Sequence, residues 1–343
     1  RNSFTFLLIL NFTIMKKYMM LVLILSPILL FPQKMSQEVQ DYKDIVMKYA
    51  DDYLTPLQID VLENYYCGPE CYTTRVNDKV VPWNKVSSDI EVLHEINTIV
   101  HESTHHFNSS TSWGSMNFVV SENKFISVTK TEIFKSNLIV NDMLKRNPKV
   151  KDMFRFDTYV NTNRNMCSSI NGIYGLMNEY CAYYNGALSA LILYEAFKDK
   201  HAPNEKDVNY FNASEEEKYF RDMEKELAMS LMSSVSAFYQ FNSFIGAYLI
   251  YAKENHYDMY VDILNNSLLV DSYSTVTFNF NVIAEKTHEY FPENNFKIVS
   301  ETGSTRITYG NNDRLLLSQE IYNDYIGVLN EFINSDNLLL TKK

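Results

Sequence analysis

Glycine is scarce in this sequence, with 9 residues in 343. Barrels, sandwiches and propellers need frequent glycine-containing turns, so this composition argues against an all-β protein and favours long helices. Positive charge is also scarce: 31 Lys and Arg stand against 42 Asp and Glu, a formal net charge of −11. Nucleic-acid binding depends on clustered Lys and Arg, so we expect no nucleic-acid partner.

Several catalytic signatures are missing as well. The sequence contains no G-x-S-x-G, no Walker-type or dinucleotide-binding glycine loop, and no cysteine in a recognisable catalytic setting. Serine and cysteine nucleophiles and nucleotide chemistry therefore have no supporting motif.

The N-terminal segment is typical of an exported protein. The chain does not begin with methionine, and we interpret residues 1–14 as an upstream or non-native extension. Residues 15–37 combine the basic pair Lys16-Lys17 with an apolar run over 18–31 that is too short to span a bilayer. This pattern predicts a signal peptide, a secreted or periplasmic location, and no stable membrane span after cleavage. An uncleaved anchor, extended by the apolar FTFLLIL upstream, is the alternative.

The remaining chain, residues 38–343, is predicted to form a single domain with a helical C-terminal part. Hydrophobic residues make up 46% of the sequence, enough for a large core, and no internal repeat or low-complexity linker interrupts it.

Four cysteines in an exported chain allow two disulfides, with three possible pairings. The CGPEC loop favours a pair between Cys67 and Cys71, which leaves Cys167 to pair with Cys181. A zinc knuckle is the rival use, but CxxxC without a matching second pair is a weak metal signal.

The hydrophobic pattern predicts an α+β fold that is predominantly helical. Expected helices cover Gln37–Asn64 (broken late by Pro56), Ser88–Asn108, Ile173–Phe197, a segment from Ser214 to about Lys253, and Arg314–Ile333. Capping boxes mark two of these starts, Ser88 with Glu91 and Ser214 with Glu217. Alternating residues predict a β-hairpin between Met116 and Ile139 and extended segments at Asp78–Trp83, Met153–Val160 and Ser274–Val282.

One of the predicted helices carries the stretch HESTH. His101 and His105 are four residues apart, so a helix presents both imidazoles on one face, as two ligands of one metal ion require. Glu102 is rotated by about 100° from His101 and can act as a general base on a water at the metal. H-E-x-x-H on a helix therefore indicates a zinc site with hydrolytic chemistry. The competing interpretation is a polar helix face, which the nearby His94 and His106 make plausible: we expect them to be surface or supporting residues.

A second motif lies downstream of HESTH. Residues 175–182 contain Gly175, Asn178, Glu179 and Ala182 in the arrangement G-x-x-N-E-x-x-A. Together with HESTH, this resembles the gluzincins, the thermolysin-like zinc metallopeptidases, in which a Glu on a second helix completes the site. The resemblance covers only these two motifs.

The resemblance implies one Zn²⁺ per chain held by His101, His105 and Glu179, with Glu102 as the catalytic base. It implies a zincin-like core and a peptide or protein substrate. The chain departs from the family at Tyr183, where an Asp commonly orients the first histidine, so another acceptor must take that role.

Three points stay open. Glu195 is an alternative third ligand, although it lies sixteen residues beyond Glu179. The donor that stabilises the oxyanion could be Tyr183, Tyr184, His256 or Tyr257, and His288 is a weaker candidate. The alternative to an exported zinc peptidase is a non-catalytic helical binding protein or an inactive zincin relative.

Overall fold

The computed structural model describes residues 37–68, 75–76, 79–80, 89–111, 114–162, 166–198, 214–291, 297–301, 304–308 and 313–334. Contacts divide the chain into residues 1–40 and residues 41–343, and the elements below belong to the second unit apart from the first turn of α2. The predicted signal peptide and extension lie outside the described residues except for Gln37. Among the described helices, none is both long and apolar enough to cross a bilayer.

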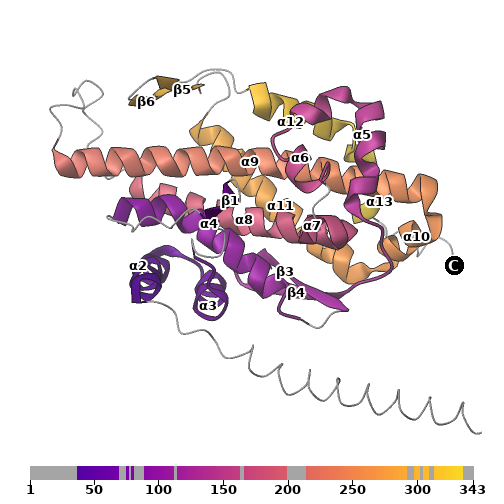
Figure 1. The fold of residues 1–343 in the computed structure, drawn as a ribbon, viewed down its shortest axis with the longest axis horizontal. Helices are drawn as coiled ribbons and strands as arrows, with labels where there is room; N and C mark the ends of the chain where they lie inside the picture. The colour runs from indigo at the N-terminus through magenta and orange to yellow at the C-terminus, as the bar shows by residue number, and fades with distance from the viewer. Residues whose placement is uncertain are drawn as a thin grey trace, which may run out of the picture. The chain divides into compact units, whose positions relative to one another are not determined.

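The centre of the fold is helix α8 (Gly172–Phe197), which packs between α4 (Asp89–Asn108) and the long helix α9 (Glu215–Asn255) (Figure 1). Almost every residue of α8 is buried, on all sides of the helix. A helix that is apolar all round is stable only when it is enclosed by other elements. Glu179 and Asn178 are therefore polar exceptions inside the core.

Two helices precede α4. The sequence predicted one helix interrupted by Pro56, and the structure has α2 (Gln37–Tyr53) followed by α3 (Pro56–Tyr65). Pro56 occupies the first turn of α3, where its missing N–H costs nothing, and Thr55 and Gln58 form a capping box. The Gln58 amide also donates a hydrogen bond of 3.0 Å to the Asn185 carbonyl, which ties α3 to α8.

The described strands form two-stranded antiparallel sheets. The predicted hairpin is confirmed as β3 (Ser115–Ser121) with β4 (Lys124–Thr129), in a register that pairs Phe118 with Ile126. It ends ten residues earlier than predicted, since residues 130–135 form no strand and Ser136–Ile139 is a 3-10 helix. The other pairs are β1 (Arg75–Val76) with β2 (Lys79–Val80), which contains the described part of the expected extended segment, and β5 (Lys297–Glu301) with β6 (Ser304–Thr308). The predominantly helical α+β class is thus confirmed.

The remaining described helices connect and cover these elements. They are η2 (Ser136–Ile139), α5 (Val140–Arg146), η3 (Pro148–Asp152), α6 (Phe156–Tyr159), α7 (Cys167–Ile170), α10 (Tyr257–Asn265), α11 (Ser267–Tyr290), α12 (Asp313–Asn323) and α13 (Ile326–Ile333). The expected helices at Ser88–Asn108, Ile173–Phe197 and after Ser214 appear as α4, α8 and α9. Ser88 and the Glu91 and Glu217 side chains lie outside what the structure describes, so the two capping boxes stay predictions.

Two predicted strands are wrong. Ser274–Val282 lies within α11, where Tyr273, Val276, Phe280 and Ile283 are buried at helical spacing. The alternation of Thr, Val, Phe and Asn imitated a strand, but tertiary burial follows the period of 3.6.

Met153–Val160 contains a turn and α6, with Met153, Phe156 and Val160 buried at intervals of three and four. Helical burial again overrides the apparent alternation. The single helix expected at Arg314–Ile333 is also wrong, because a turn at Asp324-Tyr325 separates α12 from α13. Tyr325 is 1% exposed and packs against Gly246 of α9, and this anchor fixes the turn.

The predicted disulfide between Cys167 and Cys181 is also wrong. Cys181 is a free thiol with no exposed surface, enclosed in α8, and burial raises its pKa far above the usual range. Cys67 is buried, and Cys71 lies outside the described residues, so the pairing within CGPEC is not described.

Gly186 sets the spacing between α4 and α8. A Cβ at this position would lie 2.8 Å from the carbonyl oxygen of Asn97 and 3.5 Å from Cβ of His101. Backbone atoms cannot move aside cheaply, so only glycine allows this approach.

We predict that Gly186→Ala lowers the free energy of unfolding by about 1–3 kcal/mol, because the methyl group forces the helices apart. Gly327→Ala in α13 is the matched control: nothing lies within 4 Å of its Cβ, so stability should stay equal or rise. Denaturant unfolding of the two variants measures the difference. If both variants have the same free energy of unfolding, the close contact at Gly186 is contradicted.

Candidate metal centre

Helix α4 brings the imidazoles of His101 and His105 together. The Nε2 atoms of His101 and His105 lie 3.0 Å apart, as their spacing on one helix predicted. The rings meet edge to face at a centroid distance of 4.6 Å, so both Nε2 atoms face one point.

Helix α8 supplies the third group. It runs antiparallel to α4, since Gly186 lies beside Asn97 while Asn178 accepts a hydrogen bond of 2.7 Å from Asn108. Between these contacts, Oε2 of Glu179 lies 3.1 Å from Nε2 of His105 and 3.9 Å from Nε2 of His101. The three predicted ligands therefore converge, and all are largely buried.

The three atoms fit a small metal ion. Ligands at about 2.0–2.2 Å from a tetrahedral zinc lie about 3.3–3.6 Å from one another, and the observed separations of 3.0, 3.1 and 3.9 Å bracket that range. Two nitrogens and one carboxylate oxygen are a donor set that zinc accepts, with a fourth position left open.

The ring of His101 is held in the state that a ligand needs. Burial, and then the nearby charges of His105 and Arg155, keep its pKa well below the usual value, so it is neutral. The backbone carbonyl of Ala182 acts in the opposite direction and favours protonation of the ring, but its effect is smaller than that of burial. A neutral imidazole keeps a lone pair on one ring nitrogen for a metal ion.

Position 183, where the resemblance led us to look for an acceptor for the first histidine, carries no carboxylate. Tyr183 instead packs edge-on against His101, with ring centroids 4.4 Å apart.

The protonation of His105 depends on its neighbours Glu179 and Asn178. Burial opposes its protonation, but the charge and hydrogen bond of Glu179 outweigh burial and raise the pKa of His105 to about 9. Asn178 faces the same ring, although the buried Nδ1 forms no hydrogen bond of ordinary geometry with any described residue. The carboxylate of Glu179 therefore favours a positive charge on the ring of His105.

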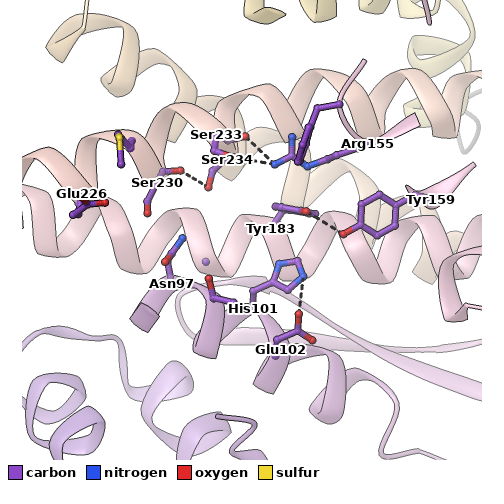
Figure 2. Close-up of a pocket in the computed structure, with 14 residues that line it drawn as sticks. Asn97, His101, Glu102, Arg155, Tyr159, Tyr183, Glu226, Ser230, Ser233 and Ser234 are labelled. Carbon is purple, nitrogen blue, oxygen red and sulfur yellow. Dashed lines mark hydrogen bonds and ion pairs between the residues drawn. The ribbon is translucent and has the colours of Figure 1, made fainter. Parts of the chain in front are cut away.

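Glu102 stands at the edge of the triad. Its Oε1 lies 4.0 Å from Nε2 of His101, and its side chain keeps 32% of its surface exposed, against 8% for Glu179 (Figure 2). Burial and the charge of Glu179 raise the pKa of Glu102, with His105 acting against them. A carboxylate with a raised pKa beside a metal site is suited to accept a proton.

A cavity of about 370 Å³ opens from this edge, and Figure 2 shows the side chains that surround it. His101 and Glu102 line one side, and Ser230, Ser233 and Ser234 of α9 line the opposite side. The remaining lining residues are Asn97, Thr98, Phe154, Arg155, Tyr159, Tyr183, Gly186, Glu226 and Met229.

Arg155 and Tyr159 were missed by the sequence analysis. They lie in the segment that was predicted to be extended, and the structure turns it into α6 so that both side chains face the cavity. The available signal was a lone Arg among apolar residues in MFRFDTYV, since a buried Arg needs a polar reason for its position.

The competing candidates lie elsewhere. His106 is exposed, and Glu195 forms an ion pair of 3.0 Å with Lys286, away from the triad. His256 stacks on Phe134, and Tyr257 is 60% exposed. None of these four lines the cavity.

Of the other candidates for the oxyanion donor, one lines the cavity and two do not. Tyr183 lines the cavity, whereas Tyr184 faces a different hollow beside the hairpin. His288 lies 3.5 Å from the hydroxyl of Tyr239 and does not line the cavity either, and the side chain of His94 lies outside the described residues.

Comparisons with protein-family models, with curated proteins and with solved structures found no match to this chain. The chemistry of the site therefore has to be argued from its own geometry.

We predict that the purified protein binds one zinc per chain, and that His101→Ala and Glu179→Ala each reduce the zinc to a trace, because two ligands bind zinc far more weakly than three. Elemental analysis measures this directly. His106→Ala and Glu195→Gln are the matched controls, since neither residue reaches the triad, and both should keep full zinc. If the wild-type protein is folded but contains no zinc, the competing interpretation of HESTHH as a polar helix face is correct.

Proposed function

We propose that this protein is a zinc-dependent hydrolase of peptide bonds, with a mechanism similar to that of the gluzincins. The observation that carries the proposal is the buried convergence of His101 and His105 from one helix with Glu179 from another, while Glu102 stands beside them at a cavity. A surface histidine cluster does not require a carboxylate from the centre of the core.

The chemical types of the donor atoms suggest a role for each residue of the site. His101, His105 and Glu179 would hold zinc, which would polarise a substrate carbonyl and lower the pKa of a water molecule to roughly 7. Glu102 takes the proton from the attacking water and later delivers it to the leaving amine. Its position at the cavity edge, more exposed than the ligands, suits a group that must contact both water and substrate.

A tyrosine pair supplies a donor for the oxyanion. The hydroxyls of Tyr159 and Tyr183 are 3.0 Å apart on the wall of the cavity, so one donates to the other and a second O–H remains for the substrate. Burial and the charge of Glu179 hold the pKa of Tyr159 well above its usual value, so it stays protonated. A fixed O–H donor that points to a developing negative charge stabilises the transition state.

We predict that Glu102→Gln keeps one zinc per chain but lowers the peptide hydrolysis rate by 100-fold or more, because the amide cannot accept a proton (general-base effects are about 10²–10⁴-fold). The measurement is turnover of a mixed peptide library, followed by mass spectrometry, beside the zinc content of the same sample. Glu122→Gln in the hairpin turn is the control and should hydrolyse at the wild-type rate. Full activity of Glu102→Gln would remove Glu102 from the mechanism.

We also predict that Tyr183→Phe lowers kcat more than it changes KM, because an oxyanion donor acts mainly in the transition state. Steady-state kinetics with one cleaved peptide separates the two constants. Tyr184→Phe, on the neighbouring position but outside the cavity, is the control and should leave both constants unchanged. A loss confined to KM would instead make Tyr183 a ground-state contact.

A further inference from the structure

Arg155 is a buried cation on the cavity wall. Only 3% of the residue is exposed. Its Nη2 donates to the carbonyl and the hydroxyl of Ser233 at 3.1 and 3.2 Å, both neutral acceptors. The guanidinium also lies 4.5 Å above the centre of the Tyr183 ring.

These contacts leave the charge uncompensated. Among the described residues, no Asp or Glu forms an ion pair with Arg155, and its buried Nε has no hydrogen-bond partner. The desolvation of an unpaired ion in a protein interior costs several kcal/mol, so buried guanidinium groups normally face an anion. Even the more exposed Arg146, whose side chain keeps 37% of its surface, has anionic partners in Asp142 and Glu254.

The metal triad does not supply the missing anion. A bound dication would be balanced by Glu102 and Glu179, and ligating imidazoles are neutral. Glu226 also lines the cavity, but among the described residues it forms no ion pair with Arg155. The guanidinium is therefore left without an anion in direct contact, which favours an anionic ligand beside it.

The position of Arg155 limits what that anion can be. A single aromatic ring, that of Tyr183, separates the guanidinium from the imidazole of His101 (Figure 2). One extended residue spans about 3.5 Å, so a carboxylate close to the scissile bond can reach Arg155. The cavity volume of about 370 Å³ is at the low end for small-molecule sites and suits the end of a chain better than a long polypeptide.

We propose that Arg155 binds the α-carboxylate at the C-terminus of the substrate, so that the site cleaves next to free peptide C-termini. This rests on the proposed function for the cleavage step, but the binding claim can be tested without turnover. The carboxylate accepts two hydrogen bonds from the guanidinium, and Phe154 and Met229 offer apolar surface for the terminal side chain. Arg155 is then a specificity-determining residue.

Binding of matched peptides to zinc-loaded Glu102→Gln protein tests the inference. The probes are N-acetyl-Ala-Ala-Phe and its C-terminal amide, measured by calorimetry. We expect the acid to bind at least tenfold more tightly than the amide. In the double variant Glu102→Gln, Arg155→Met the advantage should disappear because only the acid loses affinity.

Two further variants separate charge from structure. Arg155→Lys should keep part of the advantage, because Lys preserves the charge but not the bidentate geometry. Arg146→Met, which removes a surface arginine, should keep all of it. Zinc content and thermal stability are recorded for each variant, so a fold defect is recognised; if Arg155→Met does not fold, the parent ratio and the Lys variant decide.

Several outcomes would overturn the inference. The first is equal affinity for the acid and the amide peptide, and the second is a tighter binding of the acid that survives Arg155→Met. The third is tight binding of an amidated peptide that contains Asp, since its side-chain carboxylate would then replace the C-terminal one. A further contradicting result concerns Arg155→Met made in the active enzyme, with Glu102 in place. If this substitution lowers kcat equally for the acid and the amide peptide, Arg155 is an oxyanion donor instead. Zinc binding with hydrolysis of amidated or internal peptide bonds would leave the proposed function standing while this inference fails.

Discussion

The close contact between α4 and α8 is the constraint on which the rest of the structure depends. Gly186 allows the two backbones to approach until Asn97 is in contact, and the antiparallel path then places Ala182 beside His101 and Glu179 beside His105. A single pair of helices thus provides the three candidate ligands and the amide of Asn178, which faces the ring of His105. Because α8 is buried on all sides, the carboxylate of Glu179 cannot turn to solvent, and it must be matched within the core.

The same enclosure explains the division of roles between the two neighbouring carboxylates. Glu179 is held among the imidazoles, whereas Glu102 keeps a third of its side-chain surface and faces the cavity. Helix α9 closes the opposite side with serine hydroxyls. The turn before α6 adds Arg155, α6 adds Tyr159 and α8 adds Tyr183. The site is therefore asymmetric: a buried anionic and imidazole-rich wall faces a wall that carries a fixed positive charge.

Much of the candidate site could be predicted from sequence because its signals are local. The spacing of His101 and His105 needs only one helix, and Glu179 was marked by a carboxylate within an apolar helical segment. Arg155 could not be found in the same way, since its place depends on α6 packing beside α8, and the alternating MFRFDTYV imitated a strand. Ser274–Val282 failed for the same reason: its burial on α11 is decided by distant partners. The pairing of Cys181 failed because cysteine count says nothing about which thiol lies in a core.

The most direct test of the account is a crystal structure of the zinc-loaded protein with an anomalous difference map at the zinc edge. The account predicts one peak at about 2.0–2.2 Å from Nε2 of His101, Nε2 of His105 and a carboxylate oxygen of Glu179, with Glu102 outside the bonding distance. A map without a peak there, with the two histidines hydrogen-bonded to each other and to Glu179, would contradict it. The triad would then be a buried polar network that stabilises the contact between α4 and α8.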